Sequence, residues 1–142
     1  MKNQLTEAVV FCFVKKDKIL LEDRGKGFNN EAFYPNGNVD KEDKDLKGNY
    51  LENALYREVK EEFDNKIIIE KKKYLGNVRV DEIKVNFHIY LISKWSGNFP
   101  EVIKEPGEPD SKIAFFKMTD ATKMFKYDSA FEILKLIKKN II

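Results

Sequence analysis

The stretch that decides the fold of this chain is residues 49–63, which read NYLENALYREVKEEF. Three carboxylates on it, those of Glu58, Glu61 and Glu62, stand at i, i+3 and i+4 and so fall within about one helical turn. The stretch therefore predicts one amphipathic helix, with one side buried in a core and a neighbouring side that concentrates negative charge. Its buried side is predicted from apolar residues that recur every four positions: Leu51, Leu55, Val59 and Phe63.

The acidic patch of this helix has two interpretations. Mg²⁺ in proteins is typically held by one or two carboxylates together with substrate phosphates, so the patch is a candidate metal site. A solvated acidic face, with an ion pair between Arg57 and Glu61, is the alternative. Like charges at these spacings cost only about 0.2–0.5 kcal/mol per pair, so energy alone does not decide between the two.

Residues 57–62, Arg-Glu-Val-Lys-Glu-Glu, resemble the core of the Nudix box, the signature of the Nudix hydrolase family. Residues 35–40 look like the Pro-Gly-Gly-x-Val-Glu segment that opens the box, and residues 20–24 look like the strand before it. The resemblance implies a Nudix-like α/β/α sandwich with a mixed β-sheet between helices. It also implies hydrolysis of a pyrophosphate bond in a nucleoside diphosphate that carries a further group.

The same resemblance implies roles for individual residues. Glu58, Glu61 and Glu62 are expected to bind Mg²⁺, with Mn²⁺ as the alternative ion. Arg57 and Glu61 are expected to be catalytic, with Arg57 orienting the carboxylates by ion pairing. Gly37, in the opening segment of the box, is placed among the substrate-binding residues.

The chain departs from the Nudix pattern before the helix. Residues 41–47 look like an insertion, and the position of the family's isolated Glu falls on Asn49. Asn49 is expected to cap the helix, because Asn49-x-x-Glu52 has the spacing of a capping box. These departures leave open a second hypothesis of a different class, a Nudix-like nucleotide-binding module with weak or no hydrolysis.

Three residues outside the helix are candidates for substrate binding. Arg24, in a glycine-containing loop, could meet phosphate or belong to a solvated turn. Tyr34 could form an aromatic wall for a base or pack in the core. His88 could bond a base or a phosphate, with a hydrogen-bonded structural role as the alternative.

The proton acceptor is expected outside the helix, because a carboxylate bound to Mg²⁺ is a poor base. The segment 105–110, EPGEPD, comes late in the expected sheet and carries three acids. Glu105 is the first candidate for the general base, ahead of Glu108 and Asp110. A polar surface loop is the alternative interpretation of this segment.

The coarse order of elements is strands, helix, strands, strand, helix, which predicts an α+β arrangement with a mixed sheet. Thr119 is expected to cap a short helical turn, and Ser129 to begin the last helix in a Ser-x-x-Glu pattern. Phe131, Leu134 and either Ile137 or Ile141 are expected on the packing side of that helix. The strands are expected at residues 7–15, 18–23, 66–70, 74–80, 83–94 and 113–117.

Length and composition predict a single domain over residues 1–142. The net charge of +2 is too small to indicate nucleic acid as a partner, and the longest apolar run, residues 8–14, is far too short to span a membrane. The N-terminus lacks a signal-peptide pattern, and Cys12 is the only cysteine, which favours a cytoplasmic location. The expected partner is a small-molecule nucleotide, with a nucleoside triphosphate favoured, and a homodimer is left open.

Overall fold

The central strand, β1, decides how the molecule divides into layers. The computed structural model describes residues 5–23, 32–104 and 110–141. Every residue of β1 from Ala8 to Val14 is buried, with at most 8% of its surface exposed. Because successive side chains of a strand point to opposite faces, Val9 and Phe11 enter one core whereas Val10 and Cys12 enter the other.

The strands form one mixed sheet in the order β5-β6-β1-β2-β8-β7, with β4 paired to β1 and β3 paired to β2. β1 and β6 are parallel, and the other pairs are antiparallel. The strands are β1 (Thr6–Lys15), β2 (Lys18–Asp23), β3 (Ala32–Phe33), β4 (Asn36–Asn38), β5 (Ile68–Val80), β6 (Val85–Ser96), β7 (Val102–Ile103) and β8 (Ser111–Lys117).

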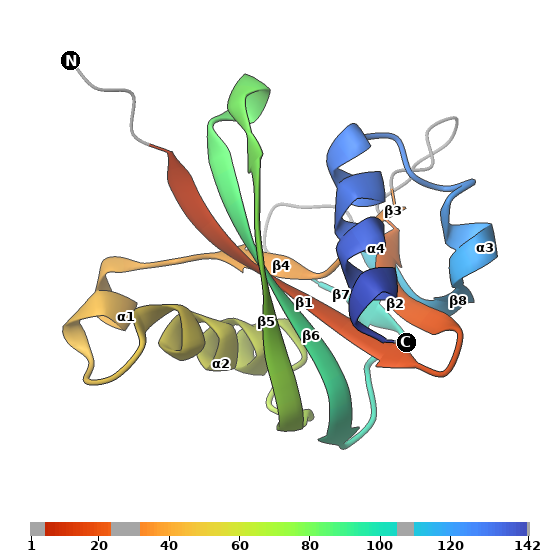
Figure 1. The fold of residues 1–142 in the computed structure, drawn as a ribbon. Coiled ribbons are helices and arrows are strands. Elements are labelled where there is room, and N and C mark those ends of the chain that lie inside the picture. The colour runs from red at the N-terminus through yellow and green to blue at the C-terminus, as the bar shows by residue number, and fades with distance from the viewer. Residues whose placement is uncertain (1–4, 24–31, 105–109, 142) are drawn as a thin grey trace.

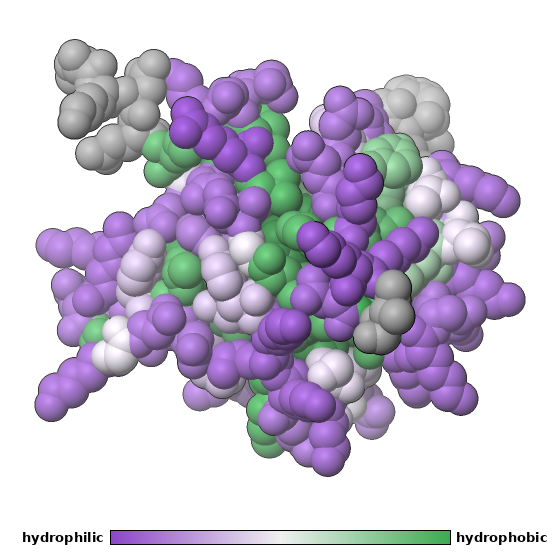
Figure 2. All heavy atoms as spheres, viewed as in Figure 1, coloured by the Kyte–Doolittle hydropathy of each residue, from purple (hydrophilic) through white to green (hydrophobic). Residues whose placement is uncertain are grey.

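Helices cover both faces of the sheet (Figure 1). Helices α1 (Lys41–Asp45) and α2 (Tyr50–Glu62) lie on one face, and α3 (Met118–Ala121) and α4 (Asp128–Asn140) lie on the other. The predicted α/β/α sandwich is therefore confirmed. No helix in the described part of the chain is long and apolar enough to cross a membrane. Figure 2 shows a largely hydrophilic face, with hydrophobic residues visible mainly between the β5–β6 hairpin and α4.

The hairpin of β5 and β6 differs from the prediction in two ways. The predicted strands 66–70 and 74–80 are one strand, because the lysines at 71–73 still pair through their backbone with β6, while the side chains of Lys72 and Lys73 reach Glu52 of α2 and Asn140 of α4. Irregular register near Ile69 and Tyr74 accommodates the length of this strand. Ile83, predicted to begin the next strand, lies in the short 3₁₀ helix η1 (Asp81–Ile83) and is 60% exposed.

The helices after β8 also begin differently from the prediction. Tyr127 stands at the N-cap of α4, whereas Ser129 lies inside the first turn and is buried. Thr119 likewise lies within α3 and does not cap it. On α4, Leu134 and Ile137 pack in the core as expected, but Phe131 is 43% exposed. The packing stripe of α4 is instead completed by Ala130 and Ile133.

Candidate functional site

The side chain of Asn49 fixes the start of α2. Its Oδ1 accepts hydrogen bonds from the backbone N–H groups of Leu51 (2.9 Å) and Glu52 (3.3 Å), which confirms the predicted helix cap. The buried residues of α2 include Leu55 and Val59, which pack against the sheet. This packing turns Glu58, Glu61 and Glu62 away from the centre of the core.

Arg57 joins two of these carboxylates. Its Nη1 donates to Glu58 Oε2 and to Glu61 Oε2, each at 3.0 Å. The predicted ion pair between Arg57 and Glu61 is therefore confirmed, and Glu58 shares the same nitrogen. One guanidinium thus sets the positions of two acids that lie almost one turn apart.

A third carboxylate, which the sequence analysis did not single out, holds Arg57 itself. Asp43 in α1 accepts from Arg57 Nε at 2.9 Å and from Nη2 at 2.8 Å, and only 1% of the Asp43 side chain is exposed. The hydrogen bonds from Arg57 hold the pKa of Asp43 below its usual range. Residues 41–47 therefore contact α2 and hold Arg57 in place, so they are part of the support of this helix.

A capping box fixes Asp43 within α1. The backbone N–H of Asp40 donates to Asp43 Oδ2 at 2.8 Å, and the two residues form the reciprocal capping pair at the start of the helix. The spacing Asp40-x-x-Asp43 was the available signal in the sequence. It marks a helix start, but it does not reveal that the second carboxylate reaches Arg57, fourteen residues further on.

Glu58 occupies a tight position between α2 and β4. A Cβ atom placed on Gly37 would overlap the Glu58 carboxylate, so a larger residue at this position would displace that side chain. Burial raises the pKa of Glu58, and the neighbouring Arg57 guanidinium opposes that shift. The negative charge of Glu58 is therefore only partly compensated within the protein.

The donor chemistry of this patch fits a divalent cation. Carboxylate oxygens are the ligands that Mg²⁺ prefers, and the partly compensated charge of Glu58 would be offset by such an ion. Glu61 lies on the exposed side of the patch, and one side-chain oxygen of Glu62 is buried. Among the described residues, no three acidic, histidine or cysteine side chains already converge to hold an ion. The assignment of the three glutamates as ligands thus stays a prediction.

His88 has partners for both ring nitrogens. Nε2 lies 2.9 Å from Glu7 Oε2, Nδ1 lies 2.9 Å from the Tyr74 hydroxyl, and the residue is 7% exposed. Tyr50 of α2 also donates to Glu7, at 2.6 Å. Burial would raise the pKa of Glu7, but the hydrogen bonds from Tyr50 and His88 outweigh it and lower that pKa. The geometry favours the structural interpretation of His88.

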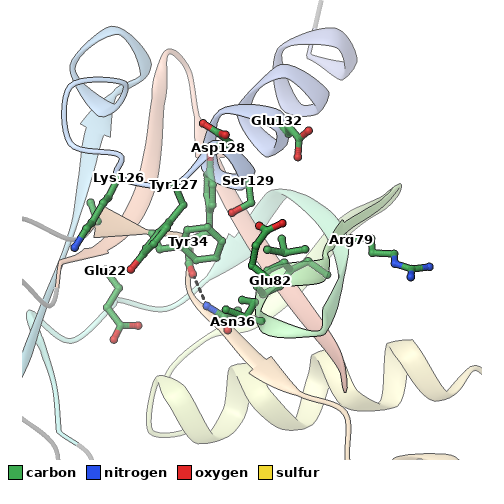
Figure 3. A pocket seen from close by; sticks show the side chains of 15 residues that line it. Glu22, Tyr34, Asn36, Arg79, Glu82, Lys126, Tyr127, Asp128, Ser129 and Glu132 are labelled. Atoms are coloured by element: carbon green, nitrogen blue, oxygen red, sulfur yellow. Dashed lines mark hydrogen bonds between the residues drawn. The ribbon is translucent and has the colours of Figure 1, made fainter. Parts of the chain in front are cut away.

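A cavity of about 780 Å³ lies on the other face of the sheet, beside the start of α4 (Figure 3). Tyr34 contributes to its wall and is also a core residue, because it is 1% exposed and its hydroxyl donates to Ala130 O at 2.9 Å. The other walls come from η1, from β3 and β4, and from residues 126–129. The sequence analysis missed this cavity because these segments are far apart in the chain and share no motif.

The cavity and the acidic patch meet at β4. Asn36 lines the cavity and donates to Tyr34 O at 2.9 Å, and the next residue, Gly37, lies against Glu58. This placement agrees with the substrate-binding role predicted for Gly37, which remains a prediction.

Three of the candidate residues lie outside the described residues: Arg24, Glu105 and Glu108. Asp110 is described and is exposed at the start of β8. The roles predicted for these four residues remain predictions.

Comparison with known proteins gives the fold. A scan against protein-family models found no match, and a search of curated proteins found none. Among solved structures, the chain is similar to a MutT Nudix hydrolase from Burkholderia pseudomallei, with 20% identity and a TM-score of 0.72 over 94% of this chain and 98% of that one. A MutT protein from Bacillus halodurans has 18% identity and a TM-score of 0.66, over 92% of this chain and 80% of that one.

The same fold also occurs in the C-terminal domain of mouse MUTYH, solved in complex with human PCNA. That domain has 11% identity and a TM-score of 0.60, over 94% of this chain and 88% of the other. The chain thus has the Nudix fold, as the resemblance at residues 57–62 implied. At these identities the likeness establishes the fold, and function has to be argued from the site.

Proposed function

We propose that this chain is a Mg²⁺-dependent hydrolase that cleaves a pyrophosphate bond in a nucleoside diphosphate derivative. A nucleoside triphosphate is the first substrate to test, and Mn²⁺ is the alternative ion. The observation that carries the proposal is the Arg57 cluster, in which one guanidinium binds Glu58, Glu61 and the buried Asp43. The fold shared with the MutT hydrolases is consistent with it.

Hydrolysis of a pyrophosphate requires charge neutralisation at the phosphate oxygens and a positioned water molecule. A bound Mg²⁺ would supply positive charge and a template for the phosphates. Glu58, Glu61 and Glu62 would hold that ion.

The residues of this chain would organise the site before substrate arrives. Arg57 fixes the directions of the Glu58 and Glu61 carboxylates, and Asp43 fixes Arg57 through two hydrogen bonds. Ligands that are already held lose little freedom on binding, which favours both affinity and correct placement. Gly37 lets Glu58 approach β4, so phosphate groups that lie along β4 would be near the acidic patch.

The proton acceptor in this proposal is Glu105, with Glu108 and Asp110 as the alternatives. Its role would be to accept the proton of the attacking water, a contribution that is typically worth about 10²–10⁴-fold in rate. The three acids can be separated by single replacements assayed across pH.

A nucleotide-binding module without turnover is the second candidate function. Two observations favour it: Asn49 stands where the Nudix pattern has a carboxylate, and Arg57 Nη1 already binds both Glu58 and Glu61. In that case the protein would bind nucleotide while the acidic patch served only to stabilise α2.

A nucleotide panel separates the two candidates. Purified protein is incubated with nucleoside triphosphates, sugar nucleotides, dinucleoside polyphosphates and ADP-ribose, with and without Mg²⁺, and the products are separated and quantified by chromatography, because sugar nucleotides and ADP-ribose would give a nucleoside monophosphate and a sugar phosphate. We expect Mg²⁺-dependent release, reduced at least about 10–100-fold by Glu61→Gln. Glu101→Gln, which changes an exposed glutamate before β7, is the matched control and should retain activity. Nucleotide binding without turnover under any condition would support the binding module instead.

A further inference from the structure

A chain of hydrogen bonds runs from the edge strand of the sheet to the start of α2. Its centre is Glu7 of β1, whose Oε2 lies 2.6 Å from the Tyr50 hydroxyl and 2.9 Å from His88 Nε2. At the other end, the Tyr74 hydroxyl lies 2.9 Å from His88 Nδ1. The chain therefore joins four elements, β5, β6, β1 and α2, whose residues are far apart in the sequence.

The directions of these hydrogen bonds follow from the Glu7 carboxylate. An ionised carboxylate only accepts, so the Tyr50 O–H and the His88 Nε2–H both donate to it. In the neutral imidazole the other ring nitrogen is an acceptor, so Nδ1 takes the O–H of Tyr74. Both ring nitrogens then have a partner in a single tautomer. Because His88 is only 7% exposed, this arrangement holds the Glu7 carboxylate in one place.

The second oxygen of Glu7 faces α1. Lys44 Nζ lies 3.6 Å from Glu7 Oε1, and the same ammonium group lies over the Tyr50 ring, 5.3 Å from its centroid. The backbone adds a further contact, because the N–H of Val39 donates to the Glu7 carbonyl at 2.9 Å, directly before the N-cap residue of α1. Glu7 therefore fixes α1 and the start of α2 relative to β1.

The residues held in this way are neighbours of those that organise the acidic patch. Lys44 follows Asp43, whose carboxylate accepts from Arg57 at 2.9 and 2.8 Å. Arg57 lies on the same helix as Tyr50 and holds two carboxylates of the patch through Nη1. Asp43 can reach Arg57 only while α1 keeps its place beside α2. A displacement of α1 would therefore displace the guanidinium and the carboxylates that it orients.

We propose that Glu7 is a positioning residue of the acidic patch. Its carboxylate holds α1 and the start of α2 against β1, and this placement lets Asp43 direct Arg57. Arg57 in turn orients Glu58 and Glu61 for a divalent cation, so Glu7 acts on the cation site only through other residues. The proposal rests on the proposed function, because it concerns the cation site of that function, but the position of Arg57 can be measured without metal or substrate.

Three variants separate this role from a general contribution to stability. Glu7→Ala removes all contacts of the carboxylate, and Tyr50→Phe removes only the hydroxyl that donates to it. Glu52→Gln is the matched control, because Glu52 also joins α2 to the sheet, but through a different contact, an ion pair with Lys72 of β5 at 3.2 Å.

The first measurement follows the Arg57 Nε–H group by ¹H–¹⁵N NMR of the metal-free protein, with the signal assigned by its loss in Arg57→Lys. The hydrogen bond from this group to Asp43 slows the exchange of its proton with water. We expect Glu7→Ala to accelerate that exchange at least about tenfold and Tyr50→Phe to accelerate it less, because one hydrogen bond to a charged group is lost and not all of them. Glu52→Gln should match the parent.

The second measurement is Mn²⁺ affinity, read from the EPR signal of the free ion. Residues that support metal ligands typically contribute about 10–100-fold, and we expect Glu7→Ala to weaken binding by about tenfold. Glu7→Ala combined with Asp43→Asn should bind Mn²⁺ no more weakly than Asp43→Asn alone, since Glu7 acts through Asp43. Independent contributions would instead multiply.

An Arg57 signal that exchanges as in the parent in both Glu7→Ala and Tyr50→Phe would overturn the proposal, and so would multiplied losses of Mn²⁺ affinity in the double variant. Where Glu7→Ala does not fold, Tyr50→Phe, which keeps the aromatic ring, decides the first measurement. If the parent protein bound no Mn²⁺, the proposed function would fail, and the Arg57 signal alone would decide whether Glu7 positions Arg57. Mn²⁺ binding with an unchanged Arg57 signal would do the reverse.

Discussion

Asp43 offers a sharp test of how the acidic patch is held together. The substitution Asp43→Asn keeps the shape of the side chain and removes its charge. In the parent protein this carboxylate accepts two hydrogen bonds from Arg57, at 2.9 and 2.8 Å, and one from the backbone of Asp40, at 2.8 Å. The asparagine amide has only one acceptor, its oxygen. Its N–H₂ group would therefore face an N–H group of Arg57 or the backbone N–H of Asp40, and donor would face donor.

The expected loss of unfolding free energy follows from this geometry. Removing one partner of a buried ion pair typically lowers the free energy of unfolding by about 3–5 kcal/mol. A hydrogen bond to a charged group contributes about 1.5–3 kcal/mol. Arg57 is 21% exposed and keeps its bonds to Glu58 and Glu61, which reduces the cost. We therefore expect Asp43→Asn to destabilise the protein by about 2–4 kcal/mol.

Urea denaturation at neutral pH measures this difference, with Asp45→Asn as the control. Asp45 is an exposed aspartate in the same short helix, and its replacement should change stability by less than about 0.5 kcal/mol. If Asp43→Asn cost no more than Asp45→Asn, the reasoning that Asp43 anchors Arg57 would be wrong.

The pH dependence gives a second measure of the same pair. The pKa of Asp43 is lower in the folded protein than in the unfolded chain, so the stabilisation is fully present above the unfolded pKa of about 3.9. It is lost as the pH falls through the lower folded pKa. The stability difference between the parent protein and Asp43→Asn should therefore shrink towards low pH. A difference that stays constant through this range would contradict the lowered pKa.

Four further predictions concern α2, β4 and the segment after β7. Asn49→Ala should lower the free energy of unfolding by about 0.5–2 kcal/mol, and an unchanged denaturation midpoint would exclude the cap. Gly37→Ala should displace the Glu58 carboxylate and abolish Mg²⁺-dependent turnover while Asn49→Ala retains it, so full turnover in Gly37→Ala would contradict the importance of this position of Glu58. Glu62→Gln should lose Mg²⁺-dependent activity but change stability by less than about 1 kcal/mol, and unfolding of this variant would exclude a purely ligand role. Glu105→Gln should reduce turnover about 10²–10⁴-fold across the pH range, and turnover within a few-fold of the parent would remove it as the sole base.

Local patterns predicted much of the fold. The four-residue period at residues 49–63 predicted α2, and the apolar runs predicted β1 and β2 with nearly the observed bounds. The break expected at lysines 71–73 was wrong because side-chain charge does not prevent backbone pairing at an open sheet edge. Ser129 was wrongly predicted as the cap because the Ser-x-x-Glu spacing also fits a serine inside the first turn. In the structure Ser129 lies in that turn and is buried.

The site was only partly predictable for a different reason. The acids on α2 and their partner Arg57 are neighbours on one helix, so the sequence places them together, and the resemblance to the Nudix box singles them out as candidates. Asp43 is a partner of Arg57 only because a short helix folds back, and the cavity needs η1, β4 and α4 to meet. Contacts of this kind depend on the tertiary arrangement and leave no periodic signal in the chain.

The two-sided burial of β1 has a consequence for how the sequence can vary in length. Val9 and Phe11 serve one core while Val10 and Cys12 serve the other, so the strand has no solvent face that could absorb a shift. Deleting one residue within β1 would exchange the side chains that enter the two cores and would also move the register with both β4 and β6. Individual apolar substitutions of similar volume should be tolerated in β1, whereas a single insertion or deletion there should prevent folding. The residues between α1 and α2, by contrast, belong to neither core; what limits changes there is the Asn49 cap and the contact of Asp43 with Arg57.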